Sequence, residues 1–112
     1  MNYYEIWFNL APGAKDLELS SAVQAYLDHL KAQGKLEWWR LTRRKFGFGP
    51  SWMPEWHVTI AFRDLTQLDS AFNVAAARHG ETERLHVEVY SRVKDFQSAL
   101  YRDFPDAVRV MG

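Results

Sequence analysis

The chain has 112 residues, 47% of them hydrophobic, and its 14 basic residues balance 14 acidic ones. These values suit one soluble domain, residues 1–112, and argue against a protein-wide attraction to nucleic acid or to an anionic membrane. Because the sequence has no cysteine, disulfides, thiol catalysis and thiolate metal sites are excluded. No apolar run approaches the length of a membrane helix, and no cationic segment precedes the first apolar stretch, so we expect a cytoplasmic protein.

The first part of the chain predicts a strand, a long helix and a second strand. Residues 3–10 are aromatic and branched and are followed by a Pro-Gly pair, which is typical of a strand that ends in a turn. Apolar residues then recur every three or four positions over residues 19–30, which predicts a helix with Asp16 as N-cap and Gly34 at its end. Residues 36–46 show no helical apolar stripe and favour a strand.

The next part predicts a third strand and a second helix. Residues 55–63 alternate between apolar and polar side chains, as a strand does. Thr66 and Asp69 resemble a capping box at the start of a helix that ends at Gly80. The side chains that this helix is predicted to bury are Leu68, Ala71, Phe72, Ala75 and Ala76.

Residues 82–94 fit either a helix or a strand. Val87 and Val89 alternate as in a strand, but the same segment also contains an i, i+4 apolar row. Because residues 96–103 can supply a final strand, we favour a short helix over residues 82–94. The element order is then βαββαβ with one extra helix, which predicts an α+β, ferredoxin-like fold whose helices cover one face of an antiparallel sheet.

Side-chain alternation divides the predicted strands between two sheet faces. The apolar face must lie under the helices, and it carries Tyr4, Ile6, Phe8, Leu10, Trp39, Leu41, Trp56, Val58, Ile60 and Phe62. The other face, here termed the outer face, carries Glu5, Trp7, Trp38, Arg40, Thr42, His57 and Thr59. This mixture is too aromatic for water and too polar for a core, so we expect the outer face to meet a partner or a ligand.

Several segments of the chain resemble the dimeric α/β-barrel superfamily, and within it an uncharacterised bacterial group. They are LDHLK at 27–31, WRLTRRK at 39–45, the histidine at His57 and LYRDFPD at 100–106. The resemblance implies a homodimer in which two subunits pack sheet against sheet and enclose a pocket. Members include small monooxygenases, decarboxylating or dehalogenating enzymes and haem-handling proteins, so the resemblance implies a fold but no single reaction.

His57 is the best candidate for a general acid or base, because imidazole titrates near neutral pH. Its neighbours across the sheet are predicted to include Glu5 and Arg40. The alternative is a histidine that only forms hydrogen bonds at the subunit interface.

The other outer-face residues are candidates for binding a small aromatic or carboxylated molecule. Arg40 could hold a carboxylate through two hydrogen bonds, although an ion pair between subunits explains it equally well. Trp7 and Trp38 could stack on a flat ligand or pack against the partner subunit. The same predicted pocket contains Glu5, Thr42 and Thr59.

No metal or cofactor is expected, because the four histidines lack metal-ligand spacing and no flavin, nicotinamide, haem or phosphate-loop motif occurs. Two alternatives to a ligand-binding or ligand-converting protein stay open. One is a structural or regulatory dimer without chemistry. The other, an RNA-recognition module, is disfavoured because its aromatic signature at residues 45–49 would end the second strand rather than lie on the third.

Overall fold

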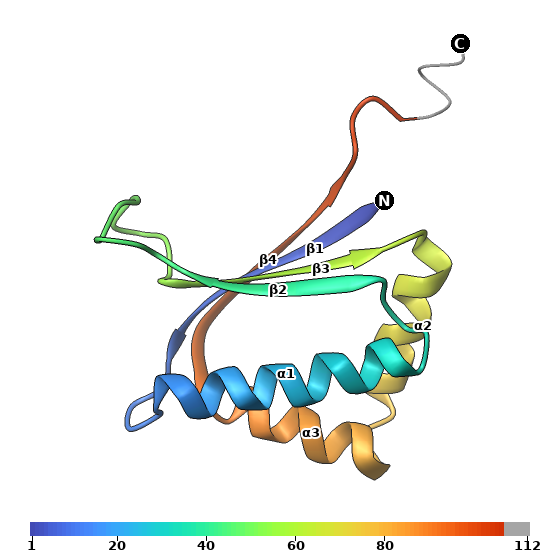
Figure 1. Ribbon diagram of the computed structural model, residues 1–112, viewed down its shortest axis with the longest axis horizontal. Coiled ribbons are helices and arrows are strands. Elements are labelled where there is room, and N and C mark those ends of the chain that lie inside the picture. Colours follow the sequence, from blue (N-terminus) through green and yellow to red (C-terminus); the bar gives the residue numbers. More distant parts are fainter. Residues whose placement is uncertain (107–112) are drawn as a thin grey trace.

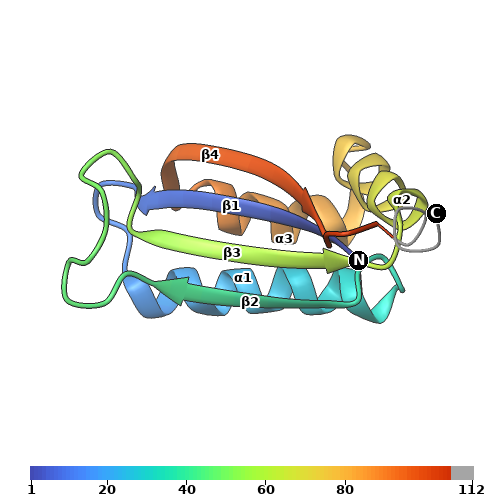
Figure 2. The same cartoon turned by 90° about the horizontal axis from the view of Figure 1, so that it is seen from above.

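All the helices of the described chain lie on one side of a four-stranded sheet (Figure 1). The computed structural model describes residues 1–106. Its elements are β1 (Asn2–Leu10), α1 (Asp16–Ala32), β2 (Trp38–Arg43), β3 (Trp56–Phe62), α2 (Leu65–Ala76), α3 (Gly80–Tyr90) and β4 (Val93–Arg102). The strand order is β2-β3-β1-β4, and every neighbouring pair is antiparallel (Figure 2). The predicted ferredoxin-like fold, with an extra helix before the last strand, is confirmed.

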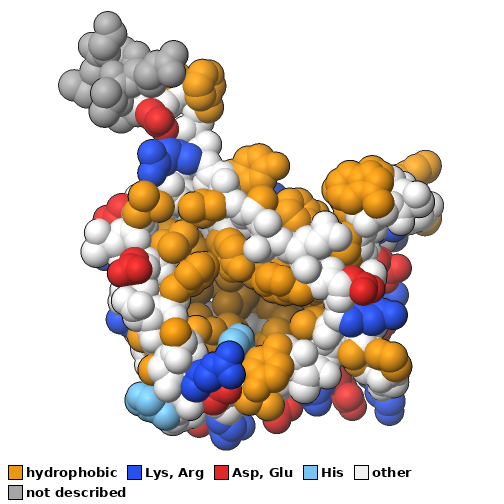
Figure 3. Space-filling view, turned by 180° about the vertical axis from the view of Figure 1, so that it is seen from behind, with side chains coloured by type: hydrophobic (Ala, Val, Ile, Leu, Met, Phe, Trp, Pro, Cys, Tyr) orange, Lys and Arg blue, Asp and Glu red, His pale blue; other side chains and the backbone are white. Residues whose placement is uncertain are grey.

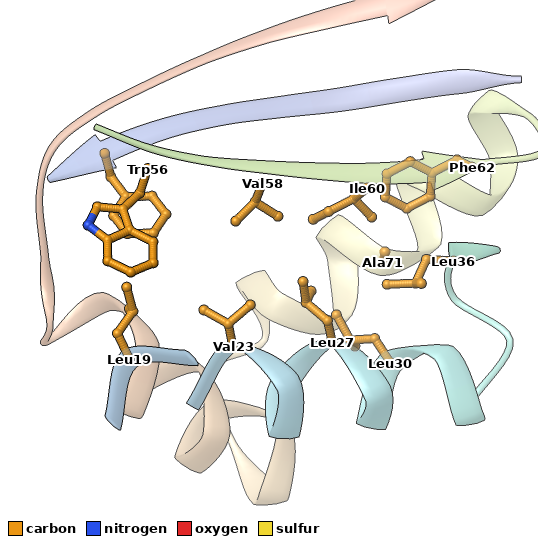
Figure 4. Close-up of a cluster of buried hydrophobic side chains, with 11 residues drawn as sticks. Leu19, Val23, Leu27, Leu30, Leu36, Trp56, Val58, Ile60, Phe62 and Ala71 are labelled. Atoms are coloured by element: carbon orange, nitrogen blue, oxygen red, sulfur yellow. The ribbon is translucent and has the colours of Figure 1, made fainter. Parts of the chain in front are cut away.

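The core fills the space between the sheet and the helices. Alternate residues of β3 point toward α1, whose apolar stripe points back at them (Figure 4). Leu19 on α1 and Phe62 on β3 are the largest fully buried side chains, at 0% and 2% exposure. The apolar face predicted by alternation therefore lies under the helices, as expected.

The second strand is shorter than the predicted 36–46. At its beginning, Leu36 is only 2% exposed because it packs into the core between α1 and α2. At its end, Phe46 and Gly47 adopt positive φ angles of 55° and 70°, which an extended strand cannot accommodate. The aromatic side chains that follow therefore stand on a loop.

Two predicted helix starts are wrong by one or two residues. Lys15, which is extended, is the N-cap of α1, and Asp16 is the first helical residue. Asp64 rather than Thr66 caps α2, because its Oδ1 accepts a hydrogen bond of 2.8 Å from the Gln67 backbone N–H. A helix begins where a side chain can satisfy its first free N–H groups, and Asp64 is better placed to do so than Thr66.

The end of α2 also differs from the prediction. The helix ends at Ala76, because Arg78 adopts a positive φ of 53°, and Gly80 begins α3 instead of ending α2. Of the side chains predicted to be buried on α2, Ala71 is buried but Phe72 is 44% exposed and Ala76 is exposed.

The helix favoured for residues 82–94 is confirmed as α3, although β4 already begins at Val93. Within residues 1–106, no helix combines the length and the apolar character needed to cross a membrane.

Candidate functional site

The strand register brings the predicted outer-face residues together. β3 lies between β1 and β2, so side chains from all three strands share the surface that the helices leave uncovered. The facing pairs are Trp7 with His57, Glu5 with Thr59, Arg40 with Thr59, and Thr42 with His57. The predicted proximity of His57 to Glu5 and Arg40 follows directly from this register.

Glu5 links His57 to Thr59. Its Oε1 lies 2.7 Å from His57 Nε2 and accepts a hydrogen bond of 2.6 Å from the Thr59 hydroxyl. The Trp7 ring stacks on the imidazole with centroids 4.8 Å apart. Contacts within the subunit therefore fix the position of the His57 ring and occupy its Nε2. The catalytic role of His57 stays a prediction.

Trp38, Arg40 and Thr42 stand on β2 beside this group. Trp38 is 39% exposed and its ring centroid lies 6.0 Å from that of Tyr3. Arg40 is exposed, and the Thr42 hydroxyl donates a hydrogen bond of 3.3 Å to the His57 carbonyl. These side chains form an open surface on the outer face of the sheet.

A cavity of about 120 Å³ lies on the opposite side of the sheet, between the sheet and helices α1 and α3. Figure 3 shows a hollow surrounded by hydrophobic side chains, with a histidine at its edge. The cavity is lined by Ile6, Phe8, Val23, Tyr26, Leu27, Val58, Ile60, His86, Val89, Tyr90, Val93 and Phe96. Its walls are therefore almost entirely apolar.

The cavity continues toward α2 and the free edge of the sheet. An adjoining space of about 460 Å³ shares Tyr26, His86 and Phe96 with it and also contacts Phe72. Phe72 and Phe96 are 44% and 55% exposed, so the mouth beside β4 is itself lined with aromatic rings. A small apolar molecule could reach the cavity by this route.

One polar group occurs in the cavity wall. His86 and Glu83 are one helical turn apart on α3, with Nδ1 and Oε2 separated by 3.6 Å. Both atoms are buried and have no hydrogen-bond partner among residues 1–106. The imidazole stacks on Tyr26, with ring centroids 5.1 Å apart, and meets the edge of Tyr90 at 5.0 Å. Buried polar atoms without a hydrogen bond are rare in native proteins, and a functional role is one explanation for them.

Burial, and secondarily the negative charge of Glu83, raises the pKa of Tyr26 from its ordinary 10.0 to about 12. The phenol of the folded protein therefore keeps its proton at a pH where the unfolded chain loses it. We expect the free energy of unfolding to fall by about 2 kcal/mol between pH 10 and pH 12 on this account. Denaturant unfolding of Tyr26→Phe should lack this part of the pH dependence; identical profiles for both proteins would contradict the assignment.

Sequence reasoning missed this second group of residues. It treated Tyr26 as part of the apolar stripe of α1 and found no metal-ligand spacing for His86. The available signal was the spacing of Glu83, His86 and Tyr90, which places all three on one side of a helix. That signal is informative only if residues 82–94 form a helix, and periodicity left the choice open.

Several known structures share this fold. A dimeric ferredoxin-like protein of unknown function from Jannaschia sp. is 16% identical over 91% of this chain and 98% of its own, with a TM-score of 0.67. A protein from Arabidopsis thaliana is 5% identical over 96% and 99%, with a TM-score of 0.71. SnoaB, a cofactor-independent oxygenase from Streptomyces nogalater, is 11% identical over 95% of both chains, with a TM-score of 0.67.

At these identities the likeness concerns the fold alone. No curated protein matches the sequence. A family model does match, and it spans residues 1–112. The chain belongs to the family of unknown function DUF6614.

Proposed function

We propose that this protein is a homodimer that binds a small, mainly apolar molecule between the sheet and the helices of each subunit. The observation that carries the proposal is the cavity of about 120 Å³ with one polar group in its wall. A dry apolar cavity of about 150 Å³ is large enough to bind benzene. At about 120 Å³ this cavity is somewhat smaller, so a substituted aromatic ring or an alicyclic molecule of similar size fits only with part of the molecule in the adjoining space of about 460 Å³.

This proposal moves the ligand away from the outer face. The pocket predicted around Trp38, Arg40 and His57 rested on a flat surface closed by the partner subunit. The cavity under the sheet, by contrast, is formed by residues of one subunit. The proposed ligand is still aromatic, as the sequence predicted, but the residues proposed to bind it lie on α1, α3 and the apolar sheet face.

The outer face is the proposed dimer interface. It presents two tryptophans, Trp7 and Trp38, on a side of the sheet that no helix covers within residues 1–106. Aromatic residues with few charges are typical of the centre of a protein interface. The Jannaschia protein, which shares the fold, is described as dimeric. An oxygenase shares the fold as well, but a fold does not determine an activity, so the proposal is limited to binding.

Filling the cavity tests the proposal. Val89 lines the cavity from α3, whereas Val87 on the same helix is 36% exposed and does not line it. We expect Val89→Phe to weaken the binding of ethylbenzene, measured by NMR titration, at least about tenfold, because the added ring competes for the same space.

Val87→Phe is the matched control and should bind ethylbenzene like the wild type. If both variants bind equally well, the ligand does not occupy this cavity. If the wild type binds neither ethylbenzene nor its hydroxylated analogue para-ethylphenol, the proposed function fails.

A further inference from the structure

We propose that Glu83 turns His86 into a hydrogen-bond acceptor toward the cavity, so that the ligand is a neutral hydroxyl compound, a phenol or an alcohol with an apolar body. This inference rests on the proposed function and names the ligand class of the same cavity. It is carried by His86 in an otherwise largely apolar wall and by the buried Glu83 carboxylate oxygen behind it, one helical turn away.

The position of Glu83 beside the His86 ring determines which ring nitrogen is free to meet a ligand. Oε2 of Glu83 lies 3.6 Å from Nδ1 of His86, and these are the two buried atoms without another partner in the described residues. In a neutral imidazole only one nitrogen carries hydrogen. A carboxylate beside Nδ1 favours hydrogen at that nitrogen, which leaves the lone pair on Nε2. A ligand that meets Nε2 must then donate a hydrogen bond.

The aromatic neighbours of His86 keep the ring in this position. Tyr26 stacks on one face of the imidazole and Tyr90 contacts it with its edge. Both tyrosines also line the cavity. A ring held from two sides cannot easily rotate to offer Nδ1 instead, so we expect Nε2 to be the nitrogen that a ligand in the cavity meets.

The charge around the cavity disfavours an anionic ligand. Among the described residues that line the cavity and its mouth, none is Lys, Arg, Asp or Glu. The carboxylate of Glu83 lies beside His86 and would repel a bound carboxylate. Burying an unpaired anion in apolar surroundings is costly, so a neutral ligand is favoured. The carboxylated ligand predicted from Arg40 does not suit this site.

Tyr26 complements the acceptor. It lines the cavity, and its hydroxyl can donate a hydrogen bond to a ligand oxygen. A hydroxyl group is the simplest ligand group that can donate to one neighbour and accept from another. We expect the hydroxyl group of the ligand to donate to His86 and to accept from Tyr26, while its apolar body fills the cavity.

Three probes that differ in one substituent test the inference: para-ethylphenol, para-ethylanisole and para-ethylbenzoate. Their affinities for the wild-type protein are measured by calorimetry at a pH of about 8, above the ordinary pKa of histidine. We expect the phenol to bind roughly tenfold or more tightly than the methyl ether, which cannot donate to Nε2, and the benzoate to bind most weakly.

Two variants identify the residues responsible. His86→Phe keeps an aromatic ring against Tyr26 but removes the acceptor, so the phenol and the ether should bind equally well. Glu83→Gln removes the negative charge and should strengthen benzoate binding relative to the wild type. Equal binding of phenol and ether by the wild type would overturn the inference while leaving the proposed function intact. Binding of none of the probes, nor of ethylbenzene, would overturn both.

Discussion

Replacing Trp38 by aspartate is expected to convert the proposed dimer into monomers. Trp38 is exposed to 39% on the outer face, and in a two-fold symmetric dimer each subunit contributes one copy of it to the same interface. Tryptophan is the residue type most often found at the energetic centre of an interface, and aspartate would bury an unpaired charge there. We expect the dissociation constant, measured by sedimentation velocity, to rise by about two orders of magnitude or more.

Leu17→Asp serves as the control for this experiment. Leu17 is an even more exposed apolar residue, at 78%, but it lies on α1 on the opposite side of the sheet. Its substitution should leave the dimer intact. A wild-type protein that sediments as a monomer at micromolar concentration would contradict the proposed dimer. So would a Trp38→Asp variant that dimerises like the wild type.

Phe62→Ala is expected to give the largest loss of stability. Phe62 is 2% exposed and packs near Leu36 and Ala71, where β3, the segment before β2 and α2 meet (Figure 4). Removing a buried phenyl ring loses its transfer free energy and leaves a cavity that the rigid neighbours fill only in part. The free energy of unfolding, measured by urea denaturation, should fall by about 3–5 kcal/mol.

The matched control is the same substitution at an exposed position. Phe48 stands on the loop between β2 and β3 and is 80% exposed. Phe48→Ala should change the free energy of unfolding by less than about 0.5 kcal/mol. Comparable losses for the two variants would mean that Phe62 does not occupy the centre of the core.

The two faces of the sheet could be predicted because strand alternation is a local property. Once residues 55–63 are recognised as a strand, Val58 and Ile60 must point one way and His57 and Thr59 the other. The contact between Glu5 and His57 then needs only the order of the strands, which the ferredoxin-like plan supplies. Sequence reasoning failed at element ends, such as those of β2 and α2, where single backbone angles at Phe46 and Arg78 decide the boundary.

The cavity could not be predicted in the same way. It depends on how closely α3 approaches the sheet, and packing distances between elements leave no periodic pattern in the sequence. Tyr26 and His86 come from different helices and meet only when α1 and α3 pack side by side. Residues such as Phe96 add to the difficulty, because they point to the helix side of the sheet and yet stay 55% exposed at the mouth. Apolar residues around a cavity and apolar residues in a filled core look the same in a sequence.

The position of the ligand is the central claim, and the ring signals of two histidines test it most directly. His86 lies in the wall of the cavity, whereas His57 lies on the outer face of the sheet. On titration of the wild-type protein with para-ethylphenol, followed by NMR, we expect the imidazole signals of His86 to shift and those of His57 to stay unchanged. A shift at His57 with none at His86 would place the ligand on the outer face and contradict this account.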